Sequence, residues 1–521
     1  MLTTTVLRIH LKMLVLLVMV GIPIIANAQL LPACPTVFNT NVDPRRSLMV
    51  TEVDVINNAI SLGEVMDKLA LDSGIPNLDR DQLWAQWWDT QNPGPGLGSG
   101  SNCNDHIDTN GMATLNGFPL DCPRNEGSEI SHNPFDPDQP GFYYPIALIN
   151  RLDLAPEDGT NRGEYRVIFA RDPAAGEGRN LLIFEAVMPN PNPGCGIDGC
   201  RAIATFWASL SRVIDPQIRA RMLHDFYFRG LPAAGVEPVI HAQHFSPGSG
   251  QIRTNQFMSG SNAQIWQLRE FKLALIPDEA GAENELIFVP VSTKGTPWGG
   301  LFDQGSGHAL TTSFMRHFMT QLDELDEDRI TKISNAVPRQ YNSGQSTEAP
   351  FSESDYPIHF DPNGAFANAI QVRLDRLNST LTPEDVVRRA RTQNCAGCHQ
   401  LSNNDNIGDG LVWPASLGFV HVHEQVTENI NGTEHFVISP ALLEEFLPHR
   451  ERVFEAYLRE DCQPCRRSLT RSGRNFEIPA MSPVFFPSDR SISLGAWIED
   501  LDAELKASWP NDTLGGPTPT H

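Results

Sequence analysis

The chain has 521 residues, of which 63 are acidic and 39 basic, and its formal net charge at pH 7 is −24. This charge disfavours nucleic acid as a partner, because binding to phosphates needs a basic face. The length is ample for two or three domains, and the 40 glycines and 40 prolines predict many turns and irregular connections.

The first residues have the pattern of an export signal. Two basic residues, Arg8 and Lys12, precede an apolar run over 13–25, and the small residues of "ANA" precede Gln29. The run is too short for a membrane span, which takes about 20 residues. We therefore expect residues 1–28 to be cleaved, and the protein to be exported to the periplasm or to the extracellular or outer-membrane side of a Gram-negative bacterium. It should not be an integral membrane protein.

Residues 29–135 form a mixed and irregular region. A helix-like stretch covers 61–74 and an aromatic stretch, "DQLWAQWWDTQ", covers 81–91. The loop over 102–122 follows them.

That loop resembles a calcium-binding loop in part. Asp108, Asn110 and Gly111 have the right offsets, but His106 and Gly117 stand at the two end positions, where acidic ligands are needed. We therefore favour an irregular loop closed by a disulfide between Cys103 and Cys122 over a calcium site.

Residues 136–336 should form a β-rich domain with helical insertions. Seven runs of β-branched and aromatic residues are separated by turn-forming residues: 143–154, 163–172, 180–189, 238–245, 251–258, 266–276 and 284–292. Helices are expected over 204–213 and 216–230. This order predicts an antiparallel, sandwich-like sheet and not a doubly wound fold.

No catalytic motif stands out in this β-rich domain. It has no phosphate-binding loop, nucleophile elbow or dinucleotide fingerprint. His241, His244 and His308 could bind a metal, but on a strand the spacing of His241 and His244 would turn their rings to opposite faces. We therefore do not favour a metal site.

Nine cysteines suggest disulfides in an exported chain. Besides the pair in the 102–122 loop, Cys195 and Cys200 should close the loop "CGIDGC". Cys462 and Cys465 should form a local disulfide, with a redox-active pair as the alternative. Cys34, in "LLPAC", is left over, and its lipidation is less favoured than a free thiol or another pairing.

The stretch "RTQNCAGCHQL", residues 391–401, carries the most specific motif. The pattern C-x-x-C-H attaches haem c, because two thiolates bond to the haem and the next imidazole binds the iron. A helix should lead into the motif, with Thr382 as N-cap and Pro383 in the first turn. Zinc would need two further ligands, and a thioredoxin-like redox site would normally follow a strand, so haem is favoured over both.

From about Leu381 to Trp509 the chain resembles a class I cytochrome c domain. The resemblance depends on "CAGCH" and on a closing amphipathic helix over 491–505. It implies a mostly α-helical domain over 366–521, joined to the β-rich domain by a linker over 337–365. It also implies one covalent haem c per chain, held by Cys395, Cys398 and His399.

The sixth iron ligand remains open at this point. The resemblance favours Met481 in "IPAMSPVFFP", while His421 or His423 in "LGFVHVHEQV" would give a bis-histidine site. On a strand those two histidines would point to the same side. An open site, or a ligand from the larger domain, is the further alternative.

Overall, the sequence predicts an α+β protein with one-electron transfer as its leading function. In that hypothesis the protein is an exported monohaem cytochrome that serves a redox partner protein. The alternative is a haem-dependent oxidoreductase, either a peroxidase or oxygenase or a dehydrogenase, whose large domain binds a small-molecule substrate. A secreted binding protein stabilised by haem is the third.

Overall fold

The computed structural model describes residues 40–98, 100–172, 178–190, 193–258, 265–277, 284–348 and 353–461. The predictions made for the signal sequence, Cys34, the Cys462–Cys465 pair, Met481 and the closing helix lie outside these residues. None of the helices within them is long and apolar enough to cross a membrane.

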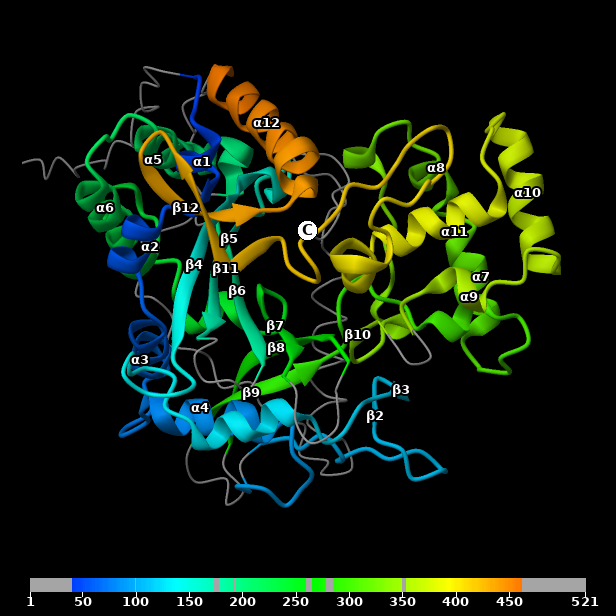
Figure 1. Ribbon diagram of the computed structural model, residues 1–521, viewed down its shortest axis with the longest axis horizontal. Coiled ribbons are helices and arrows are strands. Elements are labelled where there is room, and N and C mark those ends of the chain that lie inside the picture. The colour runs from blue at the N-terminus through cyan, green and yellow to red at the C-terminus, as the bar shows by residue number, and fades with distance from the viewer. Residues whose placement is uncertain are drawn as a thin grey trace, which may run out of the picture.

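The fold is α+β and is organised around one antiparallel sheet of eight strands (Figure 1). Along the sheet the order is β1-β4-β5-β6-β7-β8-β10, and β9 also pairs with β8. The strands of this sheet are β1 (Met49–Val50), β4 (Tyr143–Arg151), β5 (Asn161–Arg171), β6 (Arg179–Pro189), β7 (Gln251–Phe257), β8 (Gln267–Pro277), β9 (Asn284–Val291) and β10 (Ser346–Thr347). The antiparallel pairing is as predicted, but the strands form a single large sheet and not two stacked ones.

Six of the seven predicted strands are present, and one prediction is wrong. The run over 238–245 contains a short 3-10 helix, Ala242–Phe245, in place of a strand. The side chain of His241 accepts a hydrogen bond from the Gln243 amide and so begins this turn. The two predicted helical insertions are confirmed as α5 (Arg201–Leu210) and α6 (Pro216–Arg229).

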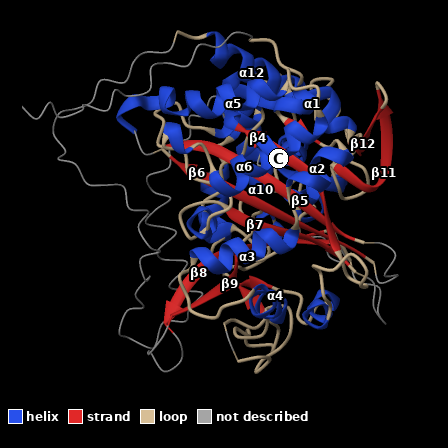
Figure 2. Ribbon diagram, turned by 90° about the vertical axis from the view of Figure 1, so that its left-hand side faces the viewer, coloured by secondary structure: helices blue, strands red, loops and turns tan. Residues whose placement is uncertain are grey.

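One face of the sheet is covered by the N-terminal helices and by α5 and α6, and Figure 2 shows α3 and α6 in front of the strands. The remaining helices here are α1 (Pro44–Ser47), α2 (Val53–Ala59), α3 (Leu62–Asp72) and α4 (Arg80–Asp89). Trp87 of α4 stacks on Phe288 with ring centroids 4.2 Å apart and meets Phe184 and Phe271 edge-on. Aromatic packing of this kind makes up the centre of the core.

The opposite face of the sheet carries charged as well as apolar side chains. Because side chains alternate between faces along a strand, the pairing register sets which residues lie together. It aligns three cross-strand rows on this face: Ile149–Arg166–Glu185, Ile168–Ile183–Arg253 and Leu181–Asn255–Leu268.

The C-terminal segments pack beside the sheet and over its charged face (Figure 1). They are α7 (Thr311–Phe318), α8 (Leu322–Leu325), α9 (Tyr356–His359), α10 (Ala365–Leu377), α11 (Pro383–Thr392), the hairpin β11 (Val422–Ile430) with β12 (Thr433–Ile438), and α12 (Leu447–Arg459). Within 366–461 the helices are thus joined by a β-hairpin, and these residues do not by themselves show a cytochrome c fold.

One hydrophobic core runs through both halves of the described chain, from Leu48 to Leu458. Within the predicted linker, Ser346 and Thr347 form β10 and pair with β8, while α9 stacks Tyr356 on Phe302 with ring centroids 4.5 Å apart. The C-terminal segments are therefore packed onto the sheet through shared side-chain contacts.

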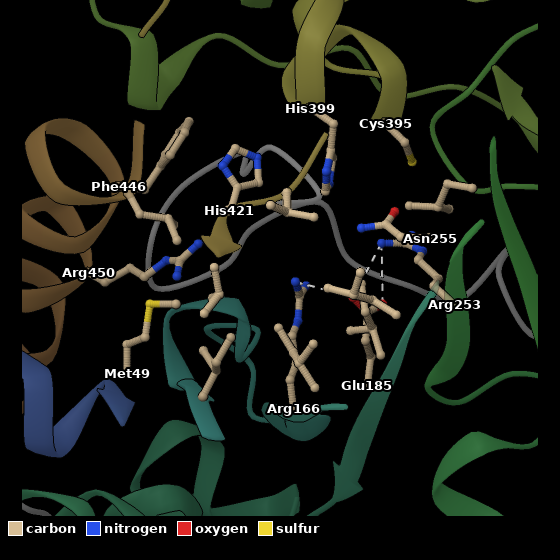
Figure 3. Close-up of a pocket in the computed structure, with 18 residues that line it drawn as sticks. Met49, Arg166, Glu185, Arg253, Asn255, Cys395, His399, His421, Phe446 and Arg450 are labelled. Carbon is tan, nitrogen blue, oxygen red and sulfur yellow. Dashed lines mark hydrogen bonds and ion pairs between the residues drawn. The ribbon is translucent and has the colours of Figure 1, made fainter. Parts of the chain in front are cut away.

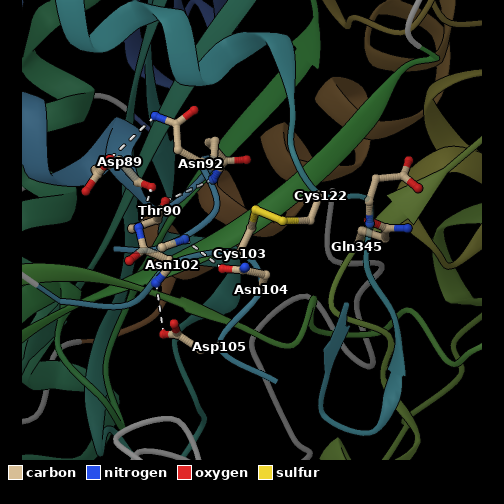
Figure 4. The surroundings of a disulfide bond; sticks show 12 residues. Asp89, Thr90, Asn92, Asn102, Cys103, Asn104, Asp105, Cys122 and Gln345 are labelled. Atoms are coloured by element: carbon tan, nitrogen blue, oxygen red, sulfur yellow. Dashed lines mark hydrogen bonds between the residues drawn. A yellow bond between two sulfur atoms is a disulfide. The ribbon is translucent and has the colours of Figure 1, made fainter. Parts of the chain in front are cut away.

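The cysteines bear out one predicted disulfide and contradict another. Cys103 and Cys122 are bonded and hold the 102–122 loop, which includes β2 (Thr114–Leu115) and β3 (Phe118–Pro119) (Figure 4). Cys195 is disulfide-bonded, but Cys200 is a free thiol, so the predicted bond between them is wrong. The thiol of Cys200 is instead turned into the core, 3.7 Å from the Asn161 carbonyl oxygen of β5.

Candidate functional site

A cavity lies between the charged face of the sheet and the segments that carry the C-x-x-C-H motif (Figure 3). The cavity volume is small, about 70 Å³, and part of the space between its walls is open to solvent. The cavity is therefore narrow. Figure 3 shows His399 and His421 projecting into it from one side, with Arg166, Glu185 and Arg253 opposite.

The motif follows directly from α11, whose start is as predicted. Thr382 accepts a hydrogen bond from the Asp385 amide, and the Asp385 carboxylate accepts one from the Thr382 amide, which together make a capping box. After the helix, Gly397 packs so closely that a Cβ there would lie 1.8 Å from the Arg391 carbonyl oxygen. Glycine is therefore required at this turn, which presents Cys395 and Cys398 to the interior.

Both motif cysteines are free thiols and are almost completely buried, Cys395 at 1% and Cys398 at 0% exposure. Burial raises the pKa of both thiols, and the nearby Arg253 guanidinium partly offsets this for Cys395. Thr296 donates a hydrogen bond to the Cys395 sulfur at 3.7 Å. The pair is thus reduced, and both sulfurs remain able to form bonds to another group.

His399 is held in one ring orientation. Its Nδ1 lies 2.7 Å from the carbonyl oxygen of Phe419, and since a carbonyl can only accept, Nδ1 carries the hydrogen. Nε2 is then the ring nitrogen suited to bind a metal. Burial lowers the pKa of His399 to about 4, so the ring is neutral at physiological pH.

His421 is the second imidazole of the cavity. Its ring centroid is 4.6 Å from that of His399, and its Nε2 lies 3.3 Å from the Cys398 sulfur. Nδ1 lies 2.8 Å from the Ser439 hydroxyl oxygen. Burial holds the pKa of His421 well below its usual value, which also favours the neutral ring.

The structure separates His421 from its alternative, His423. His423 lies at the start of β11 outside the cavity, where its Nδ1 accepts a hydrogen bond from the Gln425 amide. Of the predicted iron ligands that the structure describes, it therefore brings His399 and His421 together and leaves His423 apart.

Sequence reasoning missed the charged floor of the cavity. Glu185 lies 3.2 Å from Arg166 and 3.3 Å from Arg253, and Arg253 lies 3.2 Å from Glu270. Arg166 is also paired with Glu164. The signal was present in the strands "YRVIFAR" and "QIRTNQF", where charged residues share the spacing of apolar ones, but only the pairing register places them together.

The second predicted histidine pair has a different geometry from the one expected. Because residues 242–245 form a turn, the rings of His241 and His244 lie on the same side, with centroids 5.2 Å apart. His244 is engaged on both ring nitrogens, by the Val239 carbonyl and by Glu237. In the described part of the chain no group of three or more histidine, cysteine or acidic side chains is arranged to hold a metal ion.

The cavity contains the types of residue that a covalently bound haem needs. Two reduced thiols lie one turn apart, and a neutral histidine with its Nδ1 engaged follows the second, as the chemistry of the group requires. Two imidazoles on opposite sides of one iron need ring centroids roughly 6 Å apart, because each metal–nitrogen bond is about 2 Å. His399 and His421 would therefore have to move apart to share an iron.

No family model, no curated protein and no solved structure matches this chain. The function is therefore inferred from the residues of the cavity alone.

Proposed function

We propose that the protein is an exported monohaem c-type cytochrome that transfers single electrons. One observation carries this proposal: the two thiols of the motif are buried and reduced beside a histidine whose Nδ1 is engaged by a carbonyl. Haem attachment needs two such separate thiols, because each forms one covalent bond to the haem.

Each residue has a distinct part in this proposal. Cys395 and Cys398 would hold the haem covalently, and His399 would bind the iron through Nε2. Among the residues that the structure describes, His421 would be the second iron ligand, while Met481, which the resemblance favours, lies outside them. Haem c, when bound, supplies an Fe(III)/Fe(II) couple, and its potential depends on the axial ligands and on burial.

The cavity walls would keep water from the iron. Leu268, Val420 and Leu442 line it, and Arg253 is 3% exposed. Two imidazole ligands on the iron would suit electron exchange with a redox partner protein and would leave no position for a substrate. The partner is proposed to dock from outside, since an acidic protein of this kind can attract a basic one.

The charged residues on the cavity floor favour one alternative function. Arg166, Glu185 and Arg253 lie opposite the motif, and the Asn255 side-chain oxygen is buried with no hydrogen-bond donor among the described residues. Such groups could orient a small polar substrate or oxidant. A haem-dependent oxidoreductase with an open iron site is therefore the second candidate.

The experiment is expression of the full chain in a bacterial host with c-type maturation machinery. Haem should stay on the protein through denaturing electrophoresis, and Cys395→Ala combined with Cys398→Ala should abolish it. Cys200→Ala is the matched control, because it removes another free, buried thiol outside the motif. Haem that is retained in the double variant would refute the attachment site.

Absorption spectra then separate the two candidates. A reduced low-spin spectrum that ignores carbon monoxide and cyanide supports the electron carrier, whereas a high-spin spectrum that shifts with these ligands supports the oxidoreductase. His421→Ala should convert the first spectrum into the second, while His423→Ala should leave it unchanged. N-terminal sequencing of the periplasmic fraction should find Gln29 first.

A further inference from the structure

A residue of the sheet half packs directly on the motif histidine. The indole of Trp266, immediately before β8, stacks on the ring of His399 with centroids 5.7 Å apart and 28° between the planes. The same indole stacks on Phe419 at 5.2 Å. Trp266 is 2% exposed, so its indole is buried in these contacts.

Ring contacts, and not its N–H group, fix the position of Trp266. In the part of the chain that the structure describes, its Nε1 is buried without an acceptor. Trp84, in contrast, donates its Nε1–H to the Glu129 carbonyl at 2.9 Å. Trp266 is therefore held by packing, against the two rings and in an apolar cluster with Leu268, Cys395 and Ala396.

The backbone next to this stack is also unusual. Phe419 has a φ of 69° and follows Gly418, whose φ is 69° as well. An aromatic residue seldom adopts this left-handed conformation, which is held by surrounding contacts where it occurs. Here it allows the Phe419 carbonyl to meet Nδ1 of His399 while the Phe419 amide donates to the His399 carbonyl at 3.2 Å.

We propose that Trp266 is a positioning residue for His399: its indole holds the imidazole in the orientation in which Nε2 binds the haem iron. The inference rests on the function proposed above and gives the sheet a direct part in that function. The Phe419 carbonyl fixes the ring edge and the indole fixes one ring face, so together they define the ring plane. Changing the groups that orient a metal-binding histidine typically alters metal affinity or activity about 10–100-fold.

The test uses full-length, haem-loaded protein carrying His421→Ala, so that His399 is the remaining imidazole ligand. Resonance Raman spectroscopy after photolysis of the carbon monoxide complex gives the iron–imidazole stretching band, and a redox titration gives the reduction potential. Trp266→Leu should shift or split the band and lower the potential, because water then reaches the iron more readily. Trp266→Phe, which keeps an aromatic ring, should restore the band.

Trp207→Leu is the matched control, because Trp207 is 0% exposed and packs on Tyr165 and Phe226 on the other face of the sheet. It should leave the band unchanged. If Trp266→Leu does not fold, Trp266→Met takes its place with the same expected shift. An unchanged band and potential in Trp266→Leu, or in Trp266→Met where that variant takes its place, or an equal change in Trp207→Leu, would overturn the proposal. Absence of covalent haem from the parent protein would instead overturn the proposed function, and this inference with it.

Discussion

Replacing Glu185 with glutamine should destabilise the protein strongly, because this carboxylate links two arginines under the cavity. Glu185 is 1% exposed, and it lies 3.2 Å from Arg166 and 3.3 Å from Arg253. Both guanidinium groups are buried, and the surrounding carboxylates raise their pKa values, so both stay charged. Glu185→Gln would leave two like charges facing each other across the space of one amide.

The size of the effect follows from what each arginine retains. Removing one partner of a buried ion pair costs about 3–5 kcal/mol, mostly because a charge is left uncompensated. Arg166 keeps Glu164 and Arg253 keeps Glu270. We therefore expect the lower end of that range, a loss of about 3 kcal/mol in the free energy of unfolding.

Urea unfolding of the full chain, followed by tryptophan fluorescence, measures this loss. Glu428→Gln is the matched control, since Glu428 pairs with Arg45 but is 43% exposed in its side chain, and an exposed pair contributes less than about 1 kcal/mol. Adding Arg253→Gln to Glu185→Gln should recover about 1 kcal/mol or more, because it removes one of the opposed charges. A loss below about 1 kcal/mol for Glu185→Gln, or strictly additive losses in the double variant, would refute this reasoning.

Three further predictions concern the scaffold. Burial, reinforced by the charge of Asp121, raises the pKa of Glu353 from 4.5 to about 7. Between these pH values the folded protein keeps a proton that the unfolded chain releases. The free energy of unfolding should therefore fall as the pH rises from about 4.5 to 7. Glu353→Gln should remove this pH dependence and raise the free energy of unfolding by about 1–3 kcal/mol at pH 8. An equal increase at pH 4 would contradict the prediction. Replacing Cys103 and Cys122 by serine should cost about 3 kcal/mol in unfolding experiments, because the bond closes a segment with a sequence separation of 19. A reductant should destabilise this variant less than the parent protein, since the bond of Cys195 remains to be reduced in both. Thr382→Ala should lower the free energy of unfolding by about 1 kcal/mol, whereas Thr382→Ser, which keeps the capping oxygen, should lose much less.

Local signals in the sequence predicted most of the secondary structure of the β-rich part. β-branched runs became β4 to β9, and the predicted capping residue Thr382 begins α11. The failure over 238–245 has a physical cause, because the His241 side chain bonds to the backbone two residues on and thereby competes with strand pairing. A sandwich was expected because strand count alone does not say whether strands join one sheet or two.

The candidate site was predictable only where its residues are close in sequence. Cys395, Cys398 and His399 were found because one turn of chain brings them together. His421 and His423 are only two positions apart, yet the irregular start of β11 turns His421 into the cavity and leaves His423 outside it. No local pattern could have shown this.

The position of Trp266 bears on what the large sheet does. If the motif formed a self-contained haem domain, the groups that orient His399 would come from residues near it in sequence, as the Phe419 carbonyl does. Instead the ring face of His399 is covered by Trp266, which immediately precedes β8, and the cavity floor comes from β5, β6 and β7. Charged groups on that floor form a buried network, and a buried charge is strongly destabilising unless an opposite charge is paired with it. It follows that the sheet and the motif segment depend on each other: the sheet needs the C-terminal segments to keep water from its charged face, and the motif needs the sheet to orient its histidine. The electron-transfer function proposed here is thus a property of the joined structure, and a change on the sheet floor should alter the haem as well as the stability of the fold.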